Sequence, residues 1–156
     1  MSGKLEVSFN SPQCGWMSIG FDDGASEFHT TTAYTPHSQA LSEILKCLSS
    51  LLDAQSEKDE FKIAWSRNPE AYNLFFRRSK ETVFFQVVEY PTFNDLEKEG
   101  EIVFSYHGNL KDFCKSFYHT FAQLYEDRNT DEFEFNWRQP FPFREFEEFS
   151  KLINSL

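Results

Sequence analysis

The chain has few cysteines, and they form no metal-binding or disulfide pattern. Three cysteines occur in 156 residues, an odd number with wide spacing. This argues against a disulfide framework, and the lack of any CxxC pair argues against a zinc cluster. The sequence also opens without an apolar leader segment, so a reducing cytoplasm is the expected compartment. The three cysteines are Cys14, Cys47 and Cys114.

Long apolar runs and catalytic signatures are missing as well. No stretch approaches the roughly 18 apolar residues that a membrane helix requires. The sequence has no phosphate-binding loop, no GxGxxG, no GxSxG and no kinase motif. Its four histidines show neither the spacing of a helical metal site nor an HExxH or HxH pattern. No metal or cofactor is therefore predicted, and nothing points to a known class of enzyme.

Positive charge is scarce. Fifteen Lys and Arg residues stand against 25 Asp and Glu residues, which gives a net charge of −10 and a pI of about 4.8. Nucleic acids and anionic membranes repel such a chain, so neither is an expected partner, whereas a basic protein partner is electrostatically favourable. The densest basic group, Arg77, Arg78 and Lys80, falls at a predicted hairpin tip and is interpreted as a solubilising turn.

Aromatic residues are abundant. They make up 18% of the chain, and 19 residues are phenylalanine, so the core is expected to be rich in aromatic rings. The length suits one domain, and no linker or internal repeat divides residues 1–156. A chain of this size buries roughly 68–70% of its unfolded surface and needs no metal or disulfide to fold.

The segment from Glu60 to Tyr90 is the centre of the predicted fold. Apolar and polar residues alternate there with a period of two in three runs, which predicts three β-strands. The turn at Asn68-Pro69 and a short turn at 79–81 separate these runs. Further strands are predicted at 4–10, 16–21, 27–34 and 101–107, and Asp-Gly at 23–24 predicts a tight hairpin.

Two longer amphipathic segments predict helices. Leucines at three- and four-residue steps indicate a helix that opens at Thr35-Pro36 and ends near Ala54. A second runs from 110 to about 127, with Asn109 as its cap, and a short helix ends the chain. The order βββ-α-ββββ-α-(β)-α predicts an α+β fold, in which a largely antiparallel sheet of about seven strands carries two main helices and a short C-terminal helix.

The segment 131–137 is the most unusual stretch, because acidic and aromatic residues alternate along it. This alternation fits a short edge strand or an extended tail. Exposed aromatic residues flanked by carboxylates suit a surface that binds a basic protein partner. The alternative, favoured on general grounds, is that the aromatic residues fold back into the core. The residues predicted for a partner-binding surface are Glu132, Glu134, Phe135 and Trp137.

A second hypothesis is a small-molecule binder or enzyme with a pocket between sheet and helices. Its candidate residues are Trp65, Tyr72, His107 and Cys114. Cys114 lies on the apolar stripe of the second helix, however, where a thiol usually serves as a small buried hydrophobe. A third hypothesis is a structural homodimer that associates through edge strands or the C-terminal arm.

A short motif resembles a known group of proteins. A leucine-rich helix leads to a strand ending at Trp65, and a Pro-x-x-Tyr turn from Pro69 to Tyr72 follows it. This arrangement, spanning 41–88, resembles small, uncharacterised bacterial proteins, some of which look like immunity proteins that bind and block a toxin. Asn68 stands where an acidic residue is often expected. Together with the acidic charge, the resemblance implies a non-enzymatic cytoplasmic protein-binding module, and no site residues transfer from it.

Overall fold

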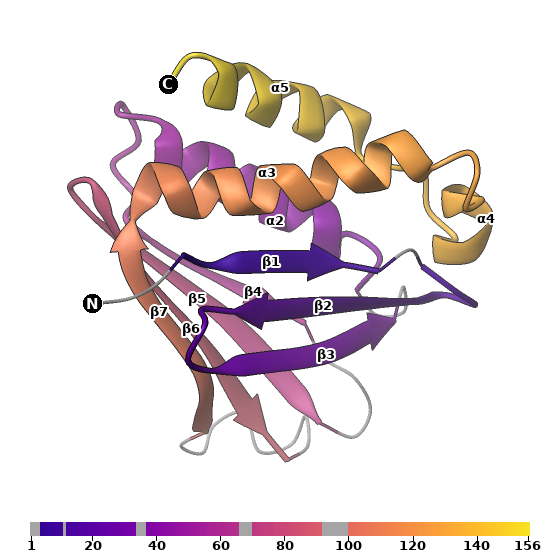
Figure 1. Cartoon of the computed structure of the whole chain (residues 1–156), viewed down its shortest axis with the longest axis horizontal. Coiled ribbons are helices and arrows are strands. Elements are labelled where there is room, and N and C mark those ends of the chain that lie inside the picture. The colour runs from indigo at the N-terminus through magenta and orange to yellow at the C-terminus, as the bar shows by residue number, and fades with distance from the viewer. Residues whose placement is uncertain (1–3, 11, 34–36, 66–69, 92–99) are drawn as a thin grey trace.

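The computed structural model describes residues 4–10, 12–33, 37–65, 70–91 and 100–156 (Figure 1). The predicted turn at Asn68-Pro69 and the predicted helix start at Thr35-Pro36 lie outside these residues. The strands are β1 (Glu6–Phe9), β2 (Trp16–Asp22), β3 (Glu27–Ala33), β4 (Glu60–Ala64), β5 (Ala71–Ser79), β6 (Thr82–Tyr90) and β7 (Glu101–Asn109). The helices are α2 (Ala40–Leu52), α3 (Leu110–Asp127), α4 (Phe133–Trp137) and α5 (Phe143–Asn154).

All seven strands pair antiparallel, so the predicted α+β class and strand number are confirmed. They are divided between two sheets, however, with the orders β1-β2-β3 and β4-β5-β6-β7. Each sheet is a meander whose neighbouring strands follow one another in the chain. Helix α2 comes between β3 and β4, and this crossing separates the two meanders in the chain.

Helix α3 covers the edge of β1 that does not pair with β2. The Phe9 N–H donates to Thr120 Oγ1 at 2.7 Å, and the Ser116 hydroxyl donates to the Leu5 carbonyl at 2.7 Å. Both side chains come from α3, four residues apart, and therefore lie on the same face of that helix. Because these groups already have partners, the edge is closed to a further strand.

The core is rich in aromatic rings and lies between the two sheets and the helices. Figure 1 shows the two sheets facing each other, with α2 and α3 along one side and α5 as the outermost layer. Phe21 of β2 meets Phe85 of β6 with ring centroids 4.9 Å apart, and Phe9 of β1 meets Phe121 of α3 at 4.9 Å. The phenylalanine-rich core that the composition predicts is confirmed.

The predicted caps and turns can be checked at two places. The Asn109 side chain accepts a hydrogen bond from the Asp112 N–H at 3.0 Å, which confirms the predicted cap of α3. At the β2–β3 hairpin, the Asp23 carboxylate accepts from the Ser26 and Ala25 N–H groups, and Gly24 takes a φ of 90°. These backbone hydrogen bonds lower the pKa of Asp23 below its ordinary value.

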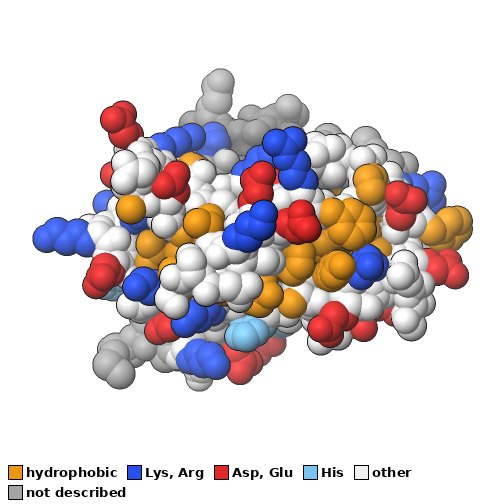
Figure 2. Space-filling model, turned by 90° about the horizontal axis from the view of Figure 1, so that it is seen from above, with side chains coloured by type: hydrophobic (Ala, Val, Ile, Leu, Met, Phe, Trp, Pro, Cys, Tyr) orange, Lys and Arg blue, Asp and Glu red, His pale blue; other side chains and the backbone are white. Residues whose placement is uncertain are grey.

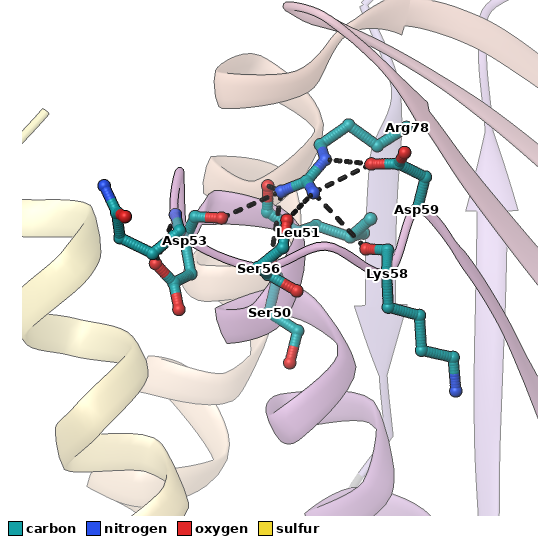
Figure 3. Close-up of polar contacts among 8 residues, drawn as sticks. Ser50, Leu51, Asp53, Ser56, Lys58, Asp59 and Arg78 are labelled. Carbon is teal, nitrogen blue, oxygen red and sulfur yellow. Dashed lines mark hydrogen bonds and ion pairs between the residues drawn. The ribbon is translucent and has the colours of Figure 1, made fainter.

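Arg78 does not belong to a solubilising turn, which corrects that prediction for this residue. Its guanidinium lies against the C-terminal end of α2 and the loop that follows, and the side chain is only 11% exposed (Figure 3). It forms an ion pair with Asp59 at 2.8 Å. The same group donates to the backbone carbonyls of Ser50, Leu51, Asp53, Ser56 and Lys58 at 2.8–3.3 Å.

Arg78 therefore supplies hydrogen-bond donors to the end of a helix whose last carbonyls lack partners within the helix. It also joins β5 to the α2–β4 connection, because its own backbone N–H donates to the Asp59 carbonyl at 2.8 Å.

Within the described ranges, no helix is long and apolar enough to cross a membrane.

Candidate functional site at the α4 end

The segment 131–137 forms a short helix rather than the predicted edge strand or extended tail. Helix α4 covers Phe133–Trp137, and each of its ends is a non-glycine residue in the left-handed region. Glu132 has a φ of 50° and Arg138 a φ of 70°. These two residues turn the chain sharply into and out of α4, which the period-two pattern did not reveal.

The helical conformation decides which aromatic side chains are exposed. Phe133 and Trp137, four residues apart, share one face of α4 and are 2% and 1% exposed. Phe135 lies on the opposite face and is 76% exposed, beside the exposed Glu132 and Glu134. The prediction that Trp137 belongs to a surface is therefore wrong, because it is a core residue. Burial of Phe133 and Trp137 agrees with the alternative in which aromatic residues complete the core.

Several backbone hydrogen bonds fix the position of α4. The Gly15 N–H donates to the Asn136 carbonyl, which ties α4 to the turn before β2. The Asn136 side chain in turn donates to the Asp131 carbonyl at 2.9 Å. On the other side, the Phe133 N–H donates to the Arg128 carbonyl at 2.8 Å, just after the end of α3.

The turn before β2 brings a further aromatic residue to this end. Cys14 and Gly15 have φ angles of 51° and 81°, as a tight two-residue hairpin turn requires, and Gln13 pairs with Trp16 across it. Trp16 is 44% exposed, because it lies on the opposite face of β2 from the buried Met17. The alternation of the strand at 16–21 predicts that Trp16 faces away from the core, although Trp16 was not predicted as a site residue.

Phe143, the first residue of α5, completes the group. It is 48% exposed, and the Arg128 guanidinium lies 5.5 Å from its ring centroid and 3.9 Å from that of Tyr125. Among the described residues, the large aromatic side chains that are exposed are thus Trp16, Phe135 and Phe143. All three come from segments at one end of the molecule, around α4 (Figure 1). We define the α4 end as Trp16, Glu132, Glu134, Phe135 and Phe143.

The charge around the α4 end is mostly negative. Residues 126–148 contain eight carboxylates and three arginines. Arg144 pairs with Glu148 at 3.5 Å, and Arg128 is engaged with aromatic rings. In Figure 2, hydrophobic side chains gather in the right half of the face formed by α3 and α5, and others lie beside acidic groups at the right-hand end. The exposed rings thus lie within an acidic neighbourhood.

Of the four residues of the predicted pocket, two contact each other directly, and three are buried. Trp65 is fully buried against Phe9, and its backbone N–H donates to the Tyr72 carbonyl at 2.9 Å. Cys114 is buried in α3, where desolvation raises the pKa of its thiol far above the ordinary value. His107 lies on the outer side of β7 and is exposed. Trp65, Tyr72 and Cys114 are thus buried core residues, whereas His107 is exposed.

Neither a metal-binding cluster among the described residues nor a similarity to a known protein indicates another site. In the part of the chain that the structure describes, no three His, Cys, Asp or Glu side chains are grouped so that they could hold a metal ion. No protein-family model, curated protein or solved structure matches the chain. The resemblance around Trp65 and Tyr72 remains a prediction, and both residues have a structural role in the core.

Proposed function

We propose that this chain is a non-enzymatic protein-binding module that engages its partner through the α4 end. The observation that carries the proposal is that Trp16, Phe135 and Phe143, the exposed large aromatic residues of the described chain, lie at one end of the molecule. Aromatic side chains that are exposed in the free protein and buried on association supply much of the binding energy in protein interfaces.

The geometry of the α4 end supports a binding surface that is preorganised in the free protein. Left-handed backbone at non-glycine residues costs free energy and tends to cluster at functional sites. Of the four such residues in the described part of the chain, Glu132 belongs to the α4 end, and Cys14 and Arg138 adjoin it. Backbone hydrogen bonds on both sides of α4 hold Phe135 in place, so little conformational entropy is lost when it binds.

The surrounding charge indicates a basic partner. Glu132 and Glu134 lie on either side of Phe135 in the sequence, and carboxylates outnumber arginines in this region. Such a field accelerates the approach of a positively charged surface and disfavours acidic ones. In its more specific form, the proposal is an immunity-type inhibitor in which these two carboxylates take the place of phosphates in a nuclease-like toxin. The cytoplasm, where the three free cysteines stay reduced, is the proposed compartment.

The test uses the tagged protein to capture its partner from native cells, followed by titration of the purified pair. Phe135→Ala is expected to weaken binding about 30-fold, since a central aromatic anchor contributes about 2 kcal/mol. The double variant E132Q/E134Q is expected to slow association and to reduce its dependence on salt. Ile102→Ala is the matched control, because Ile102 is 55% exposed on β7, away from the α4 end.

Equal loss of affinity in Phe135→Ala and Ile102→Ala would reject the α4 end as the binding surface. Capture of a second copy of this chain, with dimers seen by light scattering, would instead support the homodimer hypothesis. If the E132Q/E134Q variant bound with an unchanged salt dependence, the partner would not be recognised through these carboxylates.

A further inference from the structure

A hollow of about 890 Å³ lies where β7 leads into α3. It is separate from the α4 end. Its floor includes Tyr106 and Gly108 of β7, Ser116 of α3 and Leu5 just before β1. A smaller hollow of about 360 Å³ continues from it along β1 and shares Leu5, Ser116 and His119 with it. The volume of the main hollow lies within the range of small-molecule sites, about 300–1,000 Å³.

The floor carries the hydroxyl group of Tyr106, which has no hydrogen-bond partner in the described part of the chain. Tyr106 is 8% exposed, and its ring stacks on Phe113 with centroids 5.9 Å apart. The phenol lies across Gly108, where any side chain would collide with the Tyr106 hydroxyl. Burial, and then the nearby Asp112 carboxylate, raise the pKa of Tyr106, so the hydroxyl keeps its proton and can donate it.

Charged groups of both signs surround this hydroxyl. Two lysines and two carboxylates lie on the rim, and two histidines join them. None of the six forms an ion pair within the described residues, although the opposite charges share one hollow. The six residues are Lys4, Glu81, His107, Asp112, Lys115 and His119.

Helix α3 places several of these charged side chains together. Asp112, Lys115 and His119 follow one another at three- and four-residue steps and so share one face of α3. Glu81 lies beside the start of this helix, because its carbonyl accepts from the Leu110 N–H at 2.8 Å, and it lines the same hollow. A molecule in the hollow therefore meets positive and negative groups at once.

We infer that this hollow binds a small zwitterion of the free amino-acid class. The ligand carboxylate would bind Lys115 and Lys4, and its ammonium group would bind Asp112 and Glu81. The Tyr106 hydroxyl would donate to a ligand oxygen from the floor. A simple anion or a simple cation would satisfy only half of these groups and leave the others without partners. This inference does not depend on the α4 end, which is a separate surface.

Titration of the ¹⁵N-labelled protein with glycine, L-glutamate, L-lysine and L-phenylalanine tests this. We expect at least one of them to shift the amide signals of Gly108, Asn109 and Lys115 in a saturable way. Tyr106→Phe should weaken that binding about tenfold, as expected for the loss of one buried hydrogen bond. The control Tyr118→Phe changes a tyrosine of α3 that does not line the hollow and should leave binding unchanged.

Two results would overturn the inference. In one, none of the four amino acids shifts these signals. In the other, acetate and methylammonium, added separately, reproduce the shifts at the same concentrations, which would indicate general ion screening. A Phe135→Ala variant should bind the amino acid normally, so failure here and failure of the proposed protein-binding function can be told apart.

Discussion

Arg78 offers the sharpest test of how this fold is held together. Its guanidinium reaches five backbone carbonyls and the Asp59 carboxylate, and water has little access to it because the side chain is 11% exposed. In Figure 3 the donors fan out toward the end of α2 and the loop after it. Removing the guanidinium leaves several partly buried carbonyls without a donor.

The expected cost can be worked from these contacts. A hydrogen bond to a charged group contributes about 1.5–3 kcal/mol, but one guanidinium shares its hydrogens among several carbonyls, and water will enter part of the space. We expect Arg78→Ala to lower the free energy of unfolding by about 3 kcal/mol. For a chain of this length that corresponds to a fall in Tm of about 6–12 °C. Arg78→Lys should recover little, because a single ammonium cannot span the same carbonyls.

Chemical denaturation and thermal melting of both variants measure this, and Arg77→Ala is the matched control. Arg77 is the preceding residue, but it is exposed and contacts the Phe84 ring at 4.4 Å, an interaction of about 0.5–1 kcal/mol. If Arg77→Ala and Arg78→Ala destabilised the protein equally, the assignment of Arg78 to the end of α2 would be refuted.

Two further predictions compare a buried with an exposed aromatic side chain, and buried with exposed thiols. Trp137→Ala should lower the free energy of unfolding by about 3–5 kcal/mol, whereas Phe135→Ala should change it by less than about 0.5 kcal/mol; urea denaturation distinguishes them. Of the three thiols, only Cys14 should react with a thiol reagent in the native protein near pH 8. Burial raises the pKa of Cys47 and Cys114, so both should react only after unfolding.

The elements that were predicted correctly are those specified by local pattern. Strands β5 and β6 show alternation over most of their length because each has one mainly buried face. In β6 the alternation breaks at Val87 and Val88, which are both buried and lie at a register shift. The Asn109 cap was predictable because it depends on residues within one helical turn.

Features that depend on distant contacts could not be predicted. The cover on the edge of β1 is one of them, because Ser116 and Thr120 lie more than a hundred positions away from the residues they contact. Arg78 looked like a surface charge because its partners, the carbonyls around the end of α2, are backbone groups that leave no mark in the sequence. The pattern of side chains in a sequence does not indicate which backbone carbonyl a distant side chain will contact.

Three residues of the predicted binding surface are exposed and Trp137 is buried, and the reason is a choice between two periodicities. In a strand, Phe133, Phe135 and Trp137 would share one face and be exposed or buried together. In the short helix α4, Phe133 and Trp137 share a face four residues apart, while Phe135 faces away. Both patterns fit a run in which every second residue is aromatic, and the left-handed Glu132 that selects the helix is not a residue type that predicts such a turn. The helix is what keeps Phe135 in solvent, because two rings, Phe133 and Trp137, anchor the segment in the core while the third faces away from it.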